Sequence, residues 1–341
     1  MRAAIYNPYL DTLGGGERYT MAVATTLEKH GFTVDVEWKD TSIKEKLEQR
    51  LGIDLNNINF VSDVKRGDGY EVCFWVSDGS VPTLKSRINL LHFQVPFTNV
   101  SGTSLLNKFK LMRINKIIVN SEFTKKIIDK EFNVDSFVLY PPVSIEKFKP
   151  QKKEDTILSV ARFSELMQPK RQDVLIEAFK KLHDDNHTDW KLVLVGGVEV
   201  GSIVFLKKLK ESAKNYPIRI TESPDFKNLK NLYGTAKVFW SAAGFGIDED
   251  KTPQKAEHFG IAAVESMASG CIPIIFNAGG HKESVKNNIS GFLWNNMEEL
   301  FNFTEKSMSD EKIRRQIAKE SIERSRNFSY DEFEKKFSSL I

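Results

Sequence analysis

The stretch EHFGIAAVESMASGCIPIIFNAGGHKES, residues 257–284, indicates both the fold class and the candidate site. Glu257 and Glu265 lie eight residues apart around a Phe-Gly turn, and a helix is expected over Ile261 to Ser269. Gly260 lets the backbone approach a ligand closely, and the first free N–H groups of the helix would face the same place. Because such amides bind anions, the stretch predicts a diphosphate site.

The two glutamates have separate expected roles. Glu265 lies one turn into the helix on the face of Ile261, where a carboxylate can accept two hydrogen bonds from a ribose diol. Glu257, on the preceding loop, can reach sugar hydroxyls. The alternative is a surface glutamate followed by an ordinary amphipathic helix, and the spacing alone favours it. The flanking residues reverse that preference.

Related segments extend over nearly the whole chain. They are SVARFSELMQPKRQDVLIEAF (159–179), KLVLVGG (191–197), NLYGTAKVFWSAAGFG (231–246), GGGERYT (14–20), LLHFQVP (90–96), VNSEFTKKII (119–128) and YPPV (140–143). Together with residues 257–284 they resemble the retaining glycosyltransferases of family 4, most strongly between Ile157 and Glu283. The resemblance implies the GT-B fold, an α/β architecture of two facing Rossmann-like domains with parallel sheets and an interdomain cleft. Within the family, WSAAGFG…EHFGI…GG is similar to mannosyltransferases that extend lipid-linked oligosaccharides.

The composition is that of a soluble globular protein. The chain has 341 residues, of which 40% are hydrophobic and 28% charged, enough for two domains with their own cores. Its 49 basic and 46 acidic residues give a net charge of +3, too small to indicate nucleic acid as the main partner.

Targeting and redox features favour the cytoplasm. No apolar run approaches the roughly 18 residues of a membrane-spanning helix, and the chain opens on a strand, Ala3 to Tyr6, without a signal-peptide layout. We therefore expect a cytoplasmic protein, with the inner face of a membrane as the alternative location. Cys73 and Cys271 lie in strand-like apolar runs and are expected to be buried free thiols.

Short β-rich runs alternate with amphipathic helical stretches, which argues for parallel sheets with helices on both faces. We expect an acceptor-side domain over residues 1–145 and a nucleotide-sugar donor domain over residues 146–327. Residues 141–155 contain three prolines and read as a linker. Ser329 and Glu332 form a capping-box pattern, and in the family the terminal helix, residues 328–341, packs back on the first domain.

Moving a sugar from a nucleotide donor requires stabilising a diphosphate leaving group, which cations and helix N-termini can do without a metal. Arg162 and Lys170 match the family's Arg and Lys pair on the diphosphate. Arg171 stands where the family usually has glycine, so it is an additional or competing cation. For each of these residues the alternative is a solvated loop charge, which we favour only for Arg171.

The first domain supplies two further candidates. Gly14, Gly15 and Gly16 form a loop that permits close backbone approach by a bound group, and the family directs this loop at the donor phosphates. Tyr19 occupies the third glycine position of G-x-G-x-x-G, which disfavours a dehydrogenase. His92 follows an apolar run at a strand end, and resemblance places it beside the transferred sugar in a positioning role. Its alternative is a packing or hydrogen-bonding histidine.

After the next expected strand, Gly279, Gly280, His281 and Lys282 form a turn that the family directs at the donor sugar and phosphate, and Glu283 resembles the acidic residue that ends it. The expected catalytic residues are Arg162, Lys170, Glu257 and His92, and the expected donor-binding residues are Gly15, Gly16, Phe259, Gly260, Ile261, Glu265, Gly279, Gly280 and His281.

Asp248 and Asp250 superficially match the metal motif of the other large glycosyltransferase fold, but in a two-Rossmann chain a charged loop is the better interpretation. We therefore expect no metal ligands, no obligatory metal and no cofactor beyond the nucleotide-sugar co-substrate.

Residues 105–130 contain seven basic and two acidic residues mixed with Phe109, Met112 and other apolar side chains. Such a stretch can lie on an anionic bilayer, and many relatives use lipid-linked acceptors. The alternative is two amphipathic surface helices with ordinary lysines.

These features predict a metal-independent retaining hexosyltransferase that uses a nucleoside-diphosphate sugar and a glycan or lipid-linked acceptor. By the resemblance, the reaction takes place on the front face of the sugar, and the departing phosphate takes the acceptor's proton. The alternatives are a nucleotide-sugar 2-epimerase of the same fold and a non-catalytic protein that binds sugar nucleotides or glycans. Base, sugar and acceptor depend on loop backbone and pocket shape, which the sequence leaves open.

Overall fold

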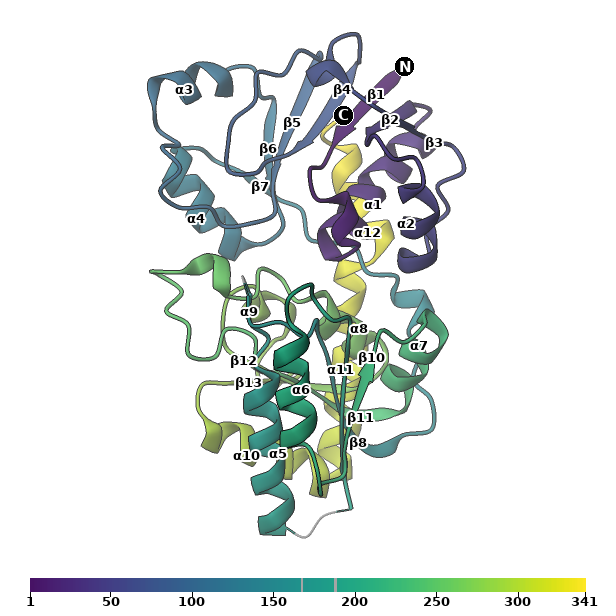
Figure 1. The fold of residues 1–341 in the computed structure, drawn as a ribbon, viewed down its shortest axis with the longest axis vertical. Helices are drawn as coiled ribbons and strands as arrows, with labels where there is room; N and C mark the ends of the chain where they lie inside the picture. The colour runs from purple at the N-terminus through teal and green to yellow at the C-terminus, as the bar shows by residue number, and fades with distance from the viewer. Residues whose placement is uncertain (167, 187–188) are drawn as a thin grey trace. The chain divides into compact units, whose positions relative to one another are not determined.

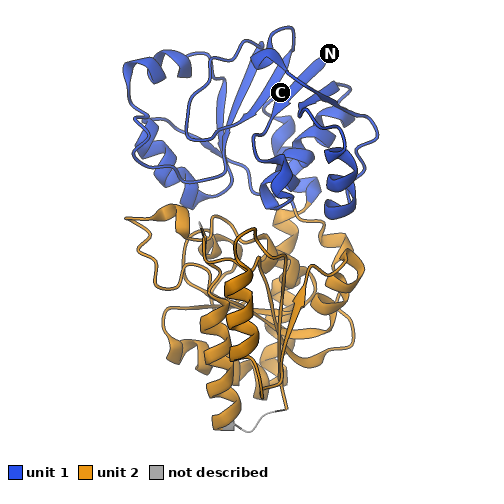
Figure 2. Ribbon diagram, viewed as in Figure 1, with its two compact units in different colours: residues 1–142, 330–341 blue, residues 143–329 orange. Residues whose placement is uncertain are grey.

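The computed structural model describes residues 1–166, 168–186 and 189–341. These residues form two compact units (Figure 2). Unit 1 comprises Met1–Pro142 and Tyr330–Ile341, and unit 2 comprises Val143–Ser329. Both boundaries fall within a few residues of the expected ones, and the terminal helix belongs to unit 1.

Unit 1 is built on a seven-stranded parallel sheet with strand order β3-β2-β1-β4-β5-β6-β7 (Figure 1). Its strands are β1 (Arg2–Tyr6), β2 (Thr33–Glu37), β3 (Ile58–Val61), β4 (Val72–Val76), β5 (Ile88–Phe93), β6 (Lys116–Val119) and β7 (Phe137–Val138). Its helices are α1 (Gly15–Lys29), α2 (Ile43–Leu51), α3 (Leu105–Leu111), α4 (Glu122–Phe132) and α12 (Tyr330–Ser338), with short 3-10 turns at Leu10–Thr12 and Lys65–Gly67.

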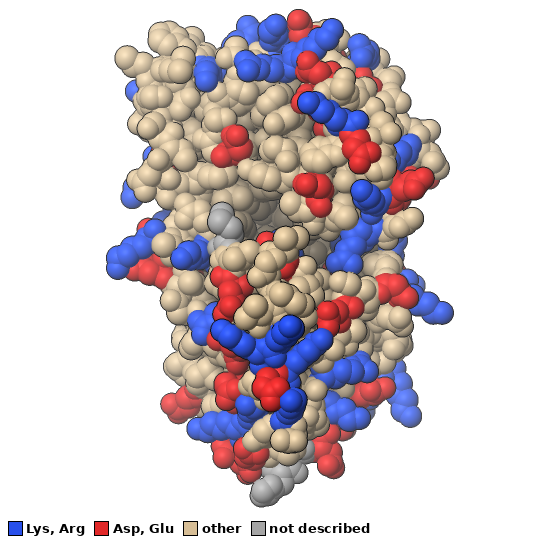
Figure 3. Space-filling model, viewed as in Figure 1, with Lys and Arg blue, Asp and Glu red and all other residues tan. Residues whose placement is uncertain are grey.

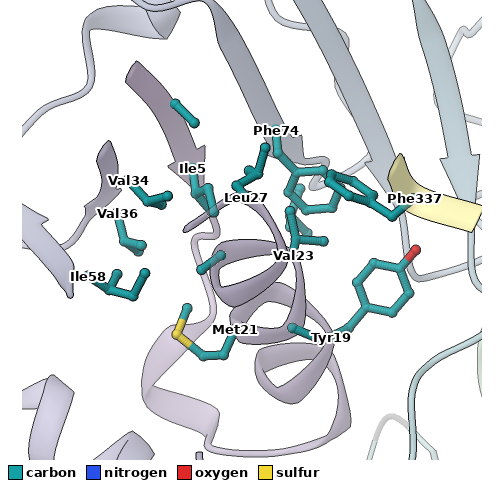
Figure 4. Packing of buried hydrophobic residues seen from close by; sticks show 14 of the residues in the cluster. Ile5, Tyr19, Met21, Val23, Leu27, Val34, Val36, Ile58, Phe74 and Phe337 are labelled. Atoms are coloured by element: carbon teal, nitrogen blue, oxygen red, sulfur yellow. The ribbon is translucent and has the colours of Figure 1, made fainter. Parts of the chain in front are cut away.

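The core of unit 1 joins segments from both ends of the chain. Apolar side chains of α1 pack between the strands and α12, as Figure 4 shows for Val23, Phe74 and Phe337. The ring of Tyr19 meets Phe333 edge-on at 5.2 Å between centroids. Because Phe337 has no exposed surface, α12 is an integral part of this core.

Unit 2 contains a six-stranded parallel sheet with strand order β10-β9-β8-β11-β12-β13. Its strands are β8 (Glu154–Val160), β9 (Lys191–Gly196), β10 (Ile218–Glu222), β11 (Ala236–Ser241), β12 (Ile272–Phe276) and β13 (Phe292–Trp294). Its helices are α5 (Gln172–Asn186), α6 (Ile203–Ser212), α7 (Phe226–Thr235), α8 (Ile261–Ala268), α9 (His281–Ser284), α10 (Met297–Ser309) and α11 (Glu311–Ser325), with short 3-10 turns at Ile145–Lys147, Pro253–Lys255 and Arg326–Phe328.

Both sheets have the strand order of a Rossmann-like unit, so the predicted fold class is confirmed. The order reverses between β1 and β4 in unit 1 and between β8 and β11 in unit 2. At such a reversal the loops leaving the carboxyl ends of neighbouring strands diverge, which makes room for a ligand. In unit 2 this point lies between the loops that follow Val160 and Ser241.

The predicted linker is wrong from Val143 onward. Val143 and Phe148 are buried, and the Phe148 ring meets Tyr233 edge-on at 5.3 Å within unit 2. Lys153 donates hydrogen bonds to the carbonyls of Ala236 and Ser269 at 2.8 and 2.7 Å. The lysines and prolines suggested a solvated segment, but its few apolar side chains enter the core.

Both cysteines are buried free thiols, as predicted. Across the described part of the chain, no helix has both the length and the apolar character needed to cross a membrane.

Candidate functional site

Three loops at the carboxyl edge of the unit 2 sheet carry several of the residues predicted for the donor site. The loop after β8 carries Arg162 and Lys170, and the loop after β11 carries Glu257 and Gly260. The loop after β12 carries Gly279 and leads into α9. Parallel pairing of β8 with β11 and of β11 with β12 therefore brings these distant segments together.

Glu257 and Lys170 form an ion pair at the meeting point of these loops. Lys170 Nζ lies 2.8 Å from Glu257 Oε2, and the two side chains are only 11% and 17% exposed. Lys170 also donates to Gln168 Oε1 at 2.6 Å. The Gln168 amide in turn donates to the Ala256 carbonyl, which ties the loop after β8 to the loop after β11.

The charge of Glu257 is held by its surroundings. Burial would raise the pKa of this carboxyl, but Lys170 and then His281 oppose that effect and the pKa falls to about 2. Burial lowers the pKa of His281 below its ordinary value, which weakens its contribution as a cation. Lys170 is therefore the permanent cation that keeps Glu257 ionised.

Two glycines permit the loops to meet. Gly260 has a φ of 93° and Gly279 a φ of 53°, both in the region that favours glycine. A Cβ on Gly260 would lie 2.7 Å from the His281 ring, and one on Gly279 would lie 2.0 Å from the Glu257 carbonyl oxygen. The Gly280 amide donates to that same carbonyl at 2.7 Å. Side chains at Gly260 and Gly279 would therefore separate the loops.

The helix α8 begins at this meeting point. Gly260 is its N-cap, and no side chain among the described residues caps it, so its first amides and positive dipole end suit an anion. Ile261 is half-buried on the first turn. Phe259 is 3% exposed and its ring packs edge-on against Phe328 at 5.2 Å, so a part in donor binding would fall to its backbone.

Glu265 lies one turn into α8, as expected, and is 5% exposed. Its Oε2 accepts a hydrogen bond of 2.9 Å from the Tyr233 hydroxyl. This hydrogen bond from Tyr233 orients the Glu265 carboxylate. The expected contact of Glu265 with a ribose stays a prediction.

The predicted cations are already paired. Arg162 lies 3.6 Å from Glu199, and its side chain is 49% exposed. Arg171 pairs with Asp173 at 3.1 Å and donates to the Phe245 carbonyl at 2.9 Å. Its φ of 53° is the left-handed conformation for which glycine is the usual residue, which gives a physical reason for the family's glycine at this position.

In unit 1 the glycine loop surrounds a carboxylate of its own. Glu17 is 2% exposed, and its Oε2 accepts from the Gly14 amide at 2.6 Å and from the Thr12 hydroxyl at 2.7 Å. Gly15 is the first residue of α1, and a Cβ on Gly16 would lie 2.3 Å from Gln94 Oε1. Glu17 thus supplies negative charge where a phosphate was expected.

His92 is enclosed in the core of unit 1. It has no exposed surface, stacks on Tyr19 at 4.3 Å and lies 3.2 Å through Nδ1 from the Ile118 carbonyl. Burial lowers its pKa to about 3, so the ring is neutral. This geometry matches the packing and hydrogen-bonding alternative, because the ring has no exposed surface, and the expected position of His92 beside the sugar stays a prediction.

Sequence reasoning missed three residues of the site. Tyr233 orients Glu265, and Gln168 bridges Lys170 to the Ala256 carbonyl. Glu249 accepts from the Gly279 amide at 2.7 Å and pairs with Lys282 at 2.9 Å. Each contacts a segment that is distant in the sequence, so the only available signal was its place inside a matching or charged segment.

The Asp248 and Asp250 segment is a charged loop. Asp248 Oδ2 pairs with Lys251 at 2.9 Å, and its Oδ1 accepts from the Asp250 amide at 3.1 Å. Within the residues that the structure describes, no group of three or more His, Cys, Asp or Glu side chains is arranged to hold a metal ion.

The family described as glycosyl transferases group 1 matches residues 142–324, more than half of the chain. The chain belongs to this family. The matched range covers nearly all of unit 2, including the three loops of the site.

Curated proteins similar to this chain in sequence include two GDP-Man:Man(3)GlcNAc(2)-PP-Dol alpha-1,2-mannosyltransferases. The one from Dictyostelium discoideum is 27% identical over 66% of this chain and 46% of its own length. The one from Homo sapiens is 29% identical over 66% of this chain and 48% of its own length. The chain therefore spans about half the length of these relatives.

Solved structures share the fold at low identity. A glycosyltransferase from Rickettsia africae superposes with a TM-score of 0.78 at 21% identity, covering 99% of this chain and 97% of its own. Anabaena Alr3699/HepE in complex with UDP superposes with a TM-score of 0.77 at 16% identity, covering 99% of both chains.

The buried ion pair predicts an acid-dependent stability. The pKa of Glu257 is lower in the folded chain, about 2, than its ordinary 4.5, so the stabilisation is present above pH 4.5 and lost as the pH falls towards 2. The Glu257→Gln variant should be less stable than wild type by about 3 kcal/mol at pH 6, with the difference vanishing near pH 2. Urea unfolding at several pH values measures the difference, and Glu311→Gln, at a side chain that is 64% exposed, is the exposed control. A difference in unfolding free energy between wild type and Glu257→Gln that does not change with pH would contradict the role of the Glu257 charge in stability.

Proposed function

We propose that this chain is a glycosyltransferase that moves a hexose from a nucleoside-diphosphate sugar to a glycan or lipid-linked acceptor. One observation carries the proposal: the predicted donor residues of three separate loops meet around the Glu257–Lys170 pair at the carboxyl edge of the unit 2 sheet. Membership of the glycosyl transferases group 1 family supports it. The names of the mannosyltransferase relatives make GDP-mannose the first donor to test.

The proposed reaction breaks the bond between the anomeric carbon and the departing phosphate oxygen and forms a bond from that carbon to the acceptor oxygen. The acceptor's proton passes to the departing phosphate, so no protein nucleophile is required. Arg162, Lys170 and the N-terminus of α8 would stabilise the charge that grows on the diphosphate. Glu257 would accept hydrogen bonds from sugar hydroxyls.

The ion pairs suggest how this work is divided between the two cations. Lys170 is committed to Glu257 at 2.8 Å in a site with little exposure, whereas Arg162 is half exposed and 3.6 Å from Glu199. An exposed pair contributes only about 0–1 kcal/mol, so a diphosphate can draw Arg162 away at little cost. Lys170 would contact the donor while it keeps Glu257 ionised.

A thermal-shift panel of uridine, guanosine and adenosine diphosphates and their sugars tests the donor site. One base series should raise the melting temperature, because specific binding to the folded state stabilises it by mass action. Glu265→Gln should weaken the free nucleotide and its sugar alike, by about 1.5–3 kcal/mol, since both contain the ribose. The matched control is Glu311→Gln, at an exposed glutamate of α11. Unchanged nucleotide affinity in Glu265→Gln would remove this residue from the ribose.

Substitution of the two cations should separate catalysis from stability. Arg162→Ala should lower turnover about 10²–10³-fold with little change in melting temperature, because its cation acts mostly in the transition state. Lys170→Ala should lower turnover similarly and also destabilise the fold, since it leaves the Glu257 carboxylate buried without its cation. Initial rates of acceptor-dependent nucleoside diphosphate release and thermal unfolding provide the two readouts. Near-normal turnover of Arg162→Ala would show that the leaving-group cation is a different residue.

The stereochemistry and the metal requirement can be measured together. We expect the product to keep the donor's α configuration and chelator to leave the rate unchanged, because the proposed clamp consists of protein groups alone. Proton NMR of the anomeric coupling, with and without EDTA, measures both. A β linkage would exclude the front-face reaction, and loss of activity with EDTA would return attention to Asp248 and Asp250. Donor epimerised in the absence of acceptor would favour the 2-epimerase.

A further inference from the structure

The short helix α3 of unit 1 exposes an apolar face. Leu105, Leu106, Phe109 and Met112 are 74%, 64%, 70% and 81% exposed, and this fully described helix contains no buried residue. Large apolar side chains grouped in this way are unusual on a protein surface that faces only water.

The face follows the helical period. Leu105, Phe109 and Met112 are spaced i, i+4 and i+7 and share one side of α3, with Leu106 beside them. Leu111 and Asn107, on the opposite side, are half-buried against unit 1. The helix thus turns its polar and mixed side inward and its most apolar side outward.

Hydrogen bonds fix α3 in this orientation. The Glu131 carboxylate accepts from the amides of Asn99, Val100 and Gly102 in the loop before the helix. Ser104 caps α3 by accepting from the Asn107 amide, and Arg113 Nε donates to the Leu84 carbonyl at 2.9 Å just after it. These hydrogen bonds within unit 1 therefore keep the apolar face of α3 turned outward.

The charged residues of the chain segment that contains α3 have one sign, while the Glu131 carboxylate of α4 beside it accepts hydrogen bonds from three amides of the preceding loop. Residues 79–121 contain no aspartate or glutamate and six basic residues. Among the described residues, Lys108, Lys110 and Arg113 form no ion pair, whereas Lys85 and Arg87 pair with Asp68 and Glu71. Figure 3 shows mostly uncharged surface at the corner of unit 1 where Figure 1 draws α3. Apolar and unpaired basic side chains thus occupy the same short segment.

We propose that α3 is a docking surface for an anionic lipid bilayer. Leu105, Leu106, Phe109 and Met112 enter the interface between headgroups and acyl chains, and the three unpaired cations contact headgroup phosphates. A second copy of this chain is a poorer occupant, because a two-fold interface through this helix would bring Lys108, Lys110 and Arg113 against like charges. The surface does not depend on the proposed sugar transfer.

Vesicle flotation of the full chain tests the surface. We expect binding to vesicles of phosphatidylcholine with phosphatidylglycerol at about 7:3, loss of binding in high salt, and weaker binding to phosphatidylcholine alone. Phe109→Ser with Met112→Ser should lower the partition coefficient at least about tenfold. Lys108→Gln and Lys110→Gln should each lower it about fivefold. Val200→Ser with Ile203→Ser, at exposed apolar positions of unit 2, should leave it unchanged.

Three results would overturn the proposal. They are absence of binding to the anionic vesicles, undiminished binding of the Phe109→Ser and Met112→Ser variant, and equal binding to both vesicle types. Light scattering of the free chain adds a fourth: a dimer that this variant converts to a monomer would make a second copy the occupant. The assay contains no nucleotide sugar and no acceptor, so its failure would leave the donor thermal shift and the turnover assays unaffected.

Discussion

The need to keep one carboxylate charged inside unit 2 organises the candidate site. Glu257 is buried, so its charge requires the ammonium of Lys170 from the loop after β8. The Glu257 carbonyl oxygen also accepts a hydrogen bond from the Gly280 amide and leaves no room for a side chain on Gly279. Both glycines lie on the loop after β12. One residue thus fixes three loops of the sheet edge, and the proposed donor groups are positioned by it.

Charge is balanced in pairs across this edge, with Arg162 beside Glu199, Lys170 beside Glu257 and Lys282 beside Glu249. A diphosphate would therefore meet little net side-chain charge, and the uncapped amides of α8 become correspondingly important. The pairs differ in depth. The shallow pair of Arg162 can yield to a ligand, whereas the deep pair of Lys170 serves structure and binding together.

Unit 1 contrasts with this arrangement, because its sequence-predicted ligand residues are occupied by the protein itself. The Glu17 carboxylate accepts a hydrogen bond from the Gly14 amide of the glycine loop, and the His92 ring is buried beside Tyr19. Its outward-facing feature is instead α3, which unit 1 holds with apolar and basic side chains exposed. Unit 2 therefore carries the paired ionic groups of the candidate site, and unit 1 presents the surface suited to a large apolar and anionic partner.

The sequence by itself determined the two parallel sheets, the family, the buried cysteines and the segments that contribute to the site, because alternating apolar runs and local motifs are properties of neighbouring residues. It misread residues 143–155 as a linker, since the composition did not show that Phe148 enters the core. Only the tertiary structure decided which charges are paired and which rings are enclosed. Glu257 with Lys170, Tyr233 with Glu265 and Glu249 with Gly279 meet through strand pairing across the sheet, and partners so far apart in the chain leave no periodic trace in its sequence.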